Sequence, residues 1–424
     1  MVAVGRRLGL MQRPALPIAA ALGNTVEWFD FAVYGYFAHA IGAAFFPSDR
    51  PSLQMVSAFG VFAVGYLMRP VGGLLLGPIG DQWGRRVLLL ISVFVMGCCS
   101  LAIALLPTTA QIGPSAALLL VLLRMLQGLS VGAEYSGAIS WSVETAPGHR
   151  RAFFSSITAS GATVGFIAGS AAAALVSLAF SAEAIEAGAW RWPFAFGALL
   201  SFVVLLLRRS LEDSRPGDVA SGWRAQFQLL FQQWPAMVRL VGSVALGTAI
   251  FYLAAVYYVD VMVAAHPEQA ALLNGLTSLV QVFSLLLALL GGYLADRWAP
   301  LPLLRRSLAV LMLALVPGFL LLGSGSIAGF VWGQALLLLP TFFYSGITPY
   351  LHASFFPGGA RCGAFSFSYS LSVALFGGSA PLVVGWMVNA AHWSSGPLLY
   401  LVLLAVLAWW AWSRKPPYLE PRPS

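Results

Sequence analysis

Charged residues are scarce in this chain. Asp, Glu, Lys and Arg make up 9% of its 424 residues, whereas 59% are hydrophobic, and the mean hydropathy is +0.83. Soluble proteins carry about a quarter charged residues, so this composition excludes a soluble globular protein and indicates an integral membrane protein. The two-residue alternation of membrane β-strands is missing as well, which leaves helices as the spanning elements.

Residue patterns of catalytic and metal sites are also missing. Cys98 and Cys99 are adjacent and Cys362 is isolated, so they predict neither a disulfide framework nor a metal site. The histidines have no metal-ligand spacing, and no HExxH, nucleophile or nucleotide-binding loop motif occurs. We therefore expect neither an enzyme nor an ATP-driven pump, and no cofactor. A receptor would need a soluble output domain, and we expect none here. The first apolar stretch is too long and too acidic for a signal peptide.

Long apolar segments fill most of the chain. A hydrocarbon core ~30 Å thick needs about 20 apolar residues per helix. Twelve segments qualify, near 16–44, 53–80, 87–106, 114–143, 152–180, 190–208, 236–263, 270–295, 303–323, 326–353, 362–391 and 396–413. The sequence therefore predicts an all-α integral membrane protein with twelve transmembrane helices.

Basic residues gather on one side of these segments. The loops on that side hold Arg6, Arg7, Arg13, Arg85, Arg86, Arg150, Arg151, Arg208, Arg209, Arg215, Arg224, Arg239, Arg297, Arg305, Arg306, Arg361, Arg414, Lys415 and Arg422. The opposite side has Arg50 and Arg191. Because cytoplasmic loops are enriched in Lys and Arg, both termini are predicted to lie in the cytoplasm of a bacterial inner membrane.

An internal repeat divides the chain. GPIGDQWGRR at 77–86 is echoed by GYLADR at 292–297, so Asp81 and Asp296 correspond at a distance of 215 positions. YSG at 135–137 recurs at 344–346. Two homologous six-helix halves follow, residues 1–208 and 236–424, joined by a cytoplasmic linker at 209–235. In that linker Trp223, Phe227, Leu230 and Trp234 recur at helical spacing, which predicts an amphipathic helix.

These features resemble the major facilitator superfamily. More narrowly, EWFDFAVYGYFA from position 27, GYLMRPVGG at 65–73 and RMLQGLSVGAEYSGA at 124–138 are similar to its metabolite:proton symporter family, which includes importers of citrate, oxoglutarate, shikimate and betaines. FYLAAVY at 251–257 and AFSFSYSLSVALFGGSAP at 364–381 resemble the seventh and eleventh helices of that family, and are more similar to its citrate and tricarboxylate members. The chain departs from the pattern at Gln82, and Ala299 and Pro300 replace the GRR ending in the second copy.

Two carboxylates lie inside the first apolar segment. Glu27 and Asp30 are three residues apart and share one helix face with Tyr34. An ionised acid at a bilayer centre costs at least ~2.5 kcal/mol on insertion scales, so both need a partner or a function. Counted along each helix, Glu27 and Arg69 both lie about 16 Å deep, and Glu134 about 14 Å. Asp30 at about 21 Å and Arg124 at about 28 Å lie higher.

The resemblance implies that helices one and four line a central cavity, where three acids and two arginines would form a network of net charge minus one. A carboxylate substrate would compete with Asp30 or Glu27 for Arg124 or Arg69, and the freed acid would take up a proton. The alternative is that these charges hold the helices together, most readily for Glu134 and for Arg69. Candidate substrate-binding residues are Arg124, Arg69, Tyr34, Gln127, Tyr252, Tyr257 and Tyr369, and candidate proton-coupling residues are Asp30, Glu27 and Glu134.

The repeated loop predicts a cytoplasmic latch. In the resembled superfamily such residues hold the two halves in one state, and here they are Asp81, Arg85, Arg86, Asp296 and Arg297. Asp260, near the outer end of the seventh segment, is a candidate gate charge.

The prediction is a secondary active transporter that moves a small organic acid of the di- or tricarboxylate type by alternating access, coupled to protons. Two alternatives stay open: an exporter of a carboxylate metabolite or siderophore, and a symporter of a zwitterion such as betaine or proline. Its expected partners are an anionic or zwitterionic small molecule, protons and the lipid bilayer. No nucleic acid is expected, and we expect a monomer.

Overall fold

The computed structural model describes residues 15–48, 51–211, 214 and 223–419, which are almost entirely helical and include no strand. Among them ten helical stretches are long and apolar enough to cross a membrane. Two predicted spans complete the twelve: α2 (Ala15–Tyr36), whose hydropathy is lowered by its acids, and α20 (Gly396–Ala411), which is shorter. The predicted all-α membrane fold is confirmed.

The other helices follow the predicted segments closely. In the first half they are α3 (Ala38–Phe45), α4 (Pro51–Trp83), α5 (Arg85–Leu105), α6 (Thr109–Ile112), α7 (Ser115–Val131), α8 (Glu134–Thr145), α9 (Arg151–Ala179), α10 (Ala182–Ala184) and α11 (Arg191–Arg208). The linker stretch contains α12 (Trp223–Gln232), and the rest of the chain contains α13 (Trp234–Tyr252), α14 (Tyr258–Ala265), α15 (Ala270–Arg297), α16 (Pro300–Leu322), α17 (Ile327–Ala353), α18 (Arg361–Ser372) and α19 (Ala380–Gly385).

The chain forms two compact units. The first contains residues 1–141, 161–227 and 358–367, and the second contains residues 142–160, 228–357 and 368–424. Each unit is thus built mainly from one sequence half and takes one short segment from the other. The division of the chain into homologous halves stays a prediction.

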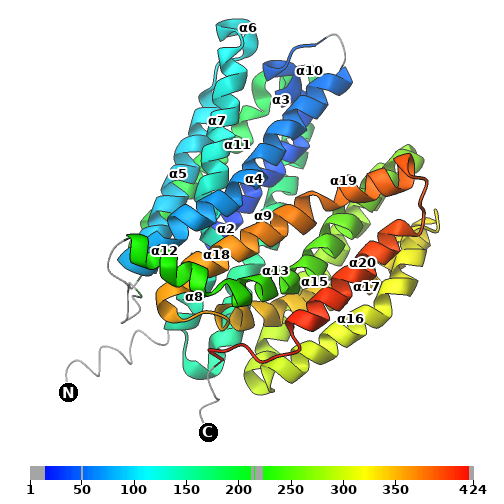
Figure 1. Cartoon of the computed structure of the whole chain (residues 1–424). Coiled ribbons are helices and arrows are strands. Elements are labelled where there is room, and N and C mark those ends of the chain that lie inside the picture. Colours follow the sequence, from blue (N-terminus) through cyan, green and yellow to red (C-terminus); the bar gives the residue numbers. More distant parts are fainter. Residues whose placement is uncertain (1–14, 49–50, 212–213, 215–222, 420–424) are drawn as a thin grey trace. The chain divides into compact units, whose positions relative to one another are not determined.

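In the first unit α7 packs along α4 and α5, and α11 packs along α5 and α2 (Figure 1). Glycines let α4 and α7 touch through their backbones. A Cβ atom added at Gly128 would lie 2.0 Å from the Gly65 carbonyl oxygen, and one at Gly132 would lie 2.1 Å from that of Arg69. This close approach brings polar side chains of α4 and α7 within reach of α2.

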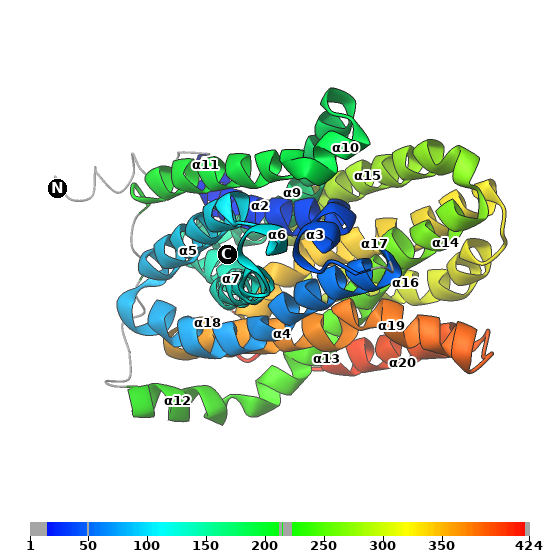
Figure 2. The same ribbon diagram turned by 90° about the horizontal axis from the view of Figure 1, so that it is seen from above.

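In the second unit α17 packs against α15 and α16, and α13 runs along α20 (Figure 2). Buried polar groups join these helices. Trp412 Nε1 donates to the Tyr344 hydroxyl at 2.6 Å, and that hydroxyl donates to the Ser243 carbonyl at 2.8 Å. His352 Nε2 lies 2.8 Å from the Ser243 hydroxyl. Within the predicted linker the structure has α12, in which Leu230 is buried and Phe231 exposed, while Trp234 begins α13, so the amphipathic linker helix stays a prediction.

Candidate functional site

The first buried ion pair joins α2 to α7. Asp30 Oδ2 accepts hydrogen bonds from Arg124 Nη1 at 2.9 Å and from Gln127 Nε2 at 3.0 Å. Asp30 Oδ1 accepts from the Ser100 hydroxyl of α5 at 2.7 Å, and Gln127 Nε2 also lies 3.1 Å from that hydroxyl. Arg124 and Gln127 are three residues apart, so both reach Asp30 from one face of α7. All four side chains are buried.

Arg124 retains unused donors. Its guanidinium lies over the Tyr34 ring, with Cζ 3.9 Å from the ring centroid, and the Tyr34 hydroxyl donates to the Ala58 carbonyl at 3.0 Å. Within the described part of the chain, Arg124 Nε and Nη2 and Gln127 Oε1 have no hydrogen-bond partner. Nε and Nη2 form the edge of a guanidinium that holds a carboxylate through two parallel hydrogen bonds. Arg124 can therefore keep Asp30 on one side and accept a second carboxylate on the other.

The second buried pair joins Glu27 of α2 to Arg69 of α4. Arg69 Nη2 lies 3.0 Å from Glu27 Oε1, and both side chains are buried. The guanidinium also lies over three aromatic rings, with Cζ 5.4 Å from the centroid of Trp28, 5.5 Å from Tyr66 and 5.9 Å from Phe31. The two acids of the first helix thus have different arginine partners.

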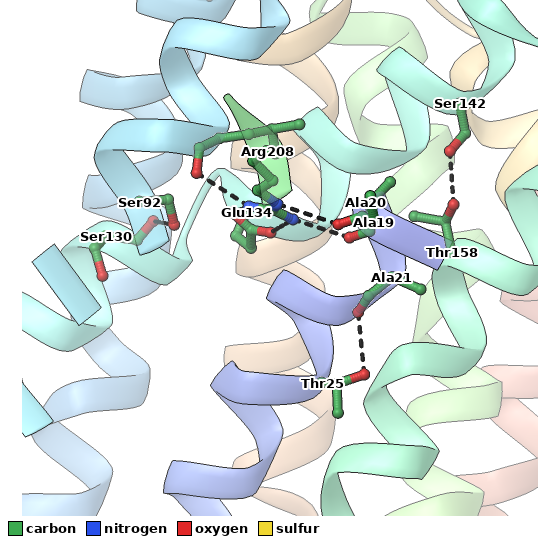
Figure 3. A network of polar contacts seen from close by, with 11 residues as sticks. Ala19, Ala20, Ala21, Thr25, Ser92, Ser130, Glu134, Ser142, Thr158 and Arg208 are labelled. Atoms are coloured by element: carbon green, nitrogen blue, oxygen red, sulfur yellow. Dashed lines mark hydrogen bonds and ion pairs between the residues drawn. The ribbon is translucent and has the colours of Figure 1, made fainter. Parts of the chain in front are cut away.

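The third buried pair, between Glu134 and Arg208, is shown in Figure 3. Arg208 Nη2 lies 2.5 Å from Glu134 Oε1, and Nη1 lies 3.1 Å from Oε2. Arg208 also donates to the carbonyls of Leu89 at 3.0 Å, Ala20 at 2.9 Å and Ala19 at 3.3 Å. One arginine thereby connects α2, α5, α8 and α11.

Two expectations about charge are corrected here. Arg208 was expected in a cytoplasmic loop, but it is fully buried at the end of α11. The signal that reveals it is helical spacing, since Ser201, Val204 and Arg208 form one buried stripe. The predicted net charge of minus one is also wrong. Arg208 is a third buried arginine, and it pairs with Glu134, so the three acids and three arginines together are neutral. The acids of that predicted network are Glu27, Asp30 and Glu134, and the buried arginines paired with them are Arg69, Arg124 and Arg208.

The first copy of the repeated loop contacts the start of α18. Asp81 Oδ1 lies 2.6 Å from Arg85 Nη1 and accepts from the backbone N–H of Cys362 at 3.0 Å. Asp81 Oδ2 accepts from the N–H of Gly363 at 2.9 Å. Arg85, expected in a loop, is buried and also donates to the Gly358 carbonyl at 2.8 Å. The carboxylate thus caps a helix N-terminus, which favours negative charge.

The second copy makes the same contact within the second unit. Asp296 accepts from the backbone N–H groups of Ala152 at 2.9 Å and Phe153 at 2.8 Å, at the start of α9. Pro300 stands where the first copy has Arg85, so the second copy has no arginine at the corresponding position. Arg297 lies over the Tyr293 ring at 4.0 Å, and Arg86 donates to the Arg209 carbonyl. Their role as a latch stays a prediction.

The remaining predicted site residues lie in the second unit. Tyr252, Tyr257 and Tyr369 belong to the second unit, whereas Asp30 and Arg124 belong to the first. Tyr252 is buried, the other two are half-buried, and Asp260 is exposed on α14. No group of His, Cys, Asp and Glu suited to a metal ion occurs among the residues that the structure describes.

Comparison with known proteins identifies the family. The model of the Major Facilitator Superfamily matches residues 20–377. The chain belongs to this superfamily. It is 30% identical over 405 residues to the glycine betaine/proline/ectoine/pipecolic acid transporter OusA of Dickeya dadantii and 31% identical over 406 residues to the proline/betaine transporter of Salmonella typhimurium. Each match covers 92% of this chain and 80% of the relative.

Solved structures agree on the fold. The proton:xylose symporter XylE bound to 6-bromo-6-deoxy-D-glucose superposes with a TM-score of 0.76 at 14% identity, covering 94% of both chains. The fucose:proton symporter FucP of Escherichia coli gives a TM-score of 0.66 at 15% identity, covering 94% of this chain and 98% of that one. The expected twelve-helix superfamily fold is confirmed. The relatives are named as transporters, which confirms the expectation of a transporter rather than an enzyme.

Proposed function

We propose that this protein is a proton-coupled symporter of a small zwitterion of the betaine or proline type. The observation that carries the proposal is the balance of buried charge in the first unit. Each of its four buried acids, Asp81 with Arg85 included, has its own arginine, so the eight groups together are neutral. A zwitterion adds no net charge, whereas a di- or tricarboxylate adds two or three negative charges, and every buried arginine among the described residues of the first unit is already paired with an acid.

The relatives support the same choice. The names of two of them include betaine and proline, which are zwitterions. They favour the zwitterion alternative over the di- or tricarboxylate that the sequence motifs favoured.

The proposed coupling uses Asp30 and Arg124. A proton on Asp30 weakens its hold on the Arg124 guanidinium, which then binds the carboxylate of the substrate through Nε and Nη2. Binding to Arg124 in turn favours the protonated form of Asp30, because each ligand shifts the equilibrium of the other. Proton and zwitterion therefore cross together, and the proton gradient drives accumulation by alternating access.

Three further predictions belong to this proposal. The protein lies in the bacterial inner membrane with both termini in the cytoplasm, as the distribution of basic residues indicates. Asp81 and Asp296 act as latches that break and re-form as the transporter alternates. Glu134 is reassigned from proton coupling to a structural role, because its oxygens bind an arginine that is itself anchored on three carbonyls.

Transport into proteoliposomes tests the proposal. With an imposed inward proton gradient, radiolabelled glycine betaine and proline should accumulate, and citrate should not. Collapse of the gradient by a protonophore should leave only equilibration. Zwitterion uptake that ignores the gradient in both directions would disprove the coupling, and citrate accumulation would restore the carboxylate interpretation.

A variant at the proposed anchor completes this test. Arg124→Lys keeps the positive charge beside Asp30 but removes Nε and Nη2, which together make two parallel hydrogen bonds to a carboxylate. The affinity for glycine betaine should therefore fall about tenfold. Direct binding to the detergent-purified protein measures this. Unchanged affinity would remove Arg124 as the anchor of the carboxylate.

A further inference from the structure

The Glu27–Arg69 pair differs chemically from the other two. Asp30 and Glu134 both accept hydrogen bonds from their arginines. In contrast, neither oxygen of Glu27 accepts a hydrogen bond of normal geometry from a described residue, although Arg69 Nη2 is 3.0 Å away. Glu27 is thus a buried carboxylate whose one close partner in the described structure is the Arg69 guanidinium, in contrast to Asp30 and Glu134.

The guanidinium of Arg69 marks a position suited to a diffuse cation. Around it stand the Glu27 carboxylate and the rings of Trp28, Phe31 and Tyr66, all three centroids within 6 Å of Cζ. Ring faces carry negative potential and attract cations without needing an N–H donor. We call Glu27, Trp28, Phe31 and Tyr66 the aromatic box.

The aromatic box adjoins the proposed carboxylate anchor. The Phe31 ring lies 5.9 Å from Cζ of Arg69 and 5.9 Å from Cζ of Arg124, so one ring contacts both cations. It also packs edge-on against Tyr66 at 5.0 Å and Phe62 at 5.6 Å, and Phe62 stacks on Tyr34 at 5.9 Å. A continuous aromatic wall therefore runs from one arginine to the other.

We infer that the aromatic box is the subsite for the cationic half of the substrate, and that it selects quaternary or highly alkylated ammonium groups. The inference rests on the proposed zwitterion transport. The ammonium group takes the place of the Arg69 guanidinium against the rings and Glu27, while the substrate carboxylate binds Arg124. The displaced Arg69 turns toward that carboxylate, so every charge keeps a partner.

This chemistry predicts an order among ligands. A trimethylammonium group spreads its charge over methyl groups and offers no N–H, which suits ring faces beside a single carboxylate. A primary ammonium needs three acceptors and is expensive to bury without them. Affinity should therefore rise in the order glycine, sarcosine, dimethylglycine, glycine betaine.

Two matched comparisons test the aromatic box. The first uses the unmodified protein, and measures competition against radiolabelled glycine betaine by the methylation series and by 3,3-dimethylbutanoate, an uncharged-headgroup isostere of the same shape. Glycine betaine should bind at least about tenfold more tightly than the isostere. The second repeats the measurement in Tyr66→Phe, which keeps the ring, and in Tyr66→Leu, which removes it.

The expected result is that Tyr66→Phe retains the preference for glycine betaine over the isostere and Tyr66→Leu loses most of it. Phe94→Leu, at a half-exposed position on α5, controls for the general loss of a ring. An affinity that is flat or reversed across the methylation series overturns the aromatic box even where Tyr66→Leu does not fold. A preference unchanged in Tyr66→Leu overturns it and leaves zwitterion transport standing, whereas a wild type that binds no zwitterion overturns both.

Discussion

Two buried ion pairs of the first unit have the same charges but different surroundings. Arg208 donates to both oxygens of Glu134 and to three backbone carbonyls. Arg124 donates to Asp30 through Nη1 and has two further donor nitrogens with no partner in the described structure. Breaking the Glu134–Arg208 pair leaves many buried polar groups without hydrogen bonds. Arg124, in contrast, can release Asp30 and bind another carboxylate.

The comparison explains why burial alone does not identify a coupling residue. Glu134 and Asp30 are both almost inaccessible, and both lie beside arginine. What separates them is whether the arginine is anchored on backbone. An arginine whose donors are all bonded to carbonyls and a carboxylate holds helices together. An arginine with unused donors can bind a ligand.

The largest effect is expected from Arg208→Ala. It leaves Glu134 as a buried charge without its partner, and breaking such a pair costs about 3–5 kcal/mol. We expect little monodisperse protein after detergent extraction. Arg209→Ala, whose exposed side chain follows directly in the chain, should behave like the wild type. A well-folded Arg208→Ala protein of unchanged Tm would remove the distinction between the two pairs.

Asp30→Asn should separate coupling from folding. The amide keeps the size of the carboxylate, and its oxygen can still accept a hydrogen bond from Arg124, so the lost counter-charge should lower Tm without preventing extraction of folded protein. Because the amide cannot take up a proton, gradient-driven accumulation of glycine betaine should be lost while exchange across the membrane persists. Full accumulation in this variant would return Asp30 to a structural role.

Gly23→Ala tests how tightly the structural pair is enclosed. A Cβ atom at Gly23 would lie 2.0 Å from Arg208 Nη2 and 2.4 Å from Glu134 Oε1, so the pair must shift. Overpacking of this kind costs about 1–3 kcal/mol, which should lower Tm without changing proton coupling. Gly35→Ala on the same helix is the matched control, since its Cβ would meet no atom within 4 Å. Equal Tm values for the two variants would contradict the close fit.

Much of the fold follows from the sequence because membrane insertion is decided locally. Each span needs about 20 apolar residues, and that requirement can be read segment by segment. All twelve predicted segments correspond to helices, including the one that carries Glu27 and Asp30. The repeated aspartates were also visible, since Asp81 and Asp296 lie in similar loops.

The partners of those aspartates were not visible. Asp81 binds backbone N–H groups at the start of α18, and Asp296 binds those at the start of α9. Every residue except proline has such a group, so no side chain in the sequence marks the contact. Only the folded chain shows which helix end each carboxylate caps.

The sequence by itself determined the membrane class, the number of helices and the unusual placement of two acids in the first of them. Only the tertiary structure decided how those acids are balanced. Asp30 pairs with Arg124, Glu27 with Arg69, and the unexpected Arg208 neutralises Glu134. The physical reason is that hydropathy is a property of each segment, whereas charge balance depends on which helices touch. That balance also turns the substrate proposal from an organic acid toward a zwitterion.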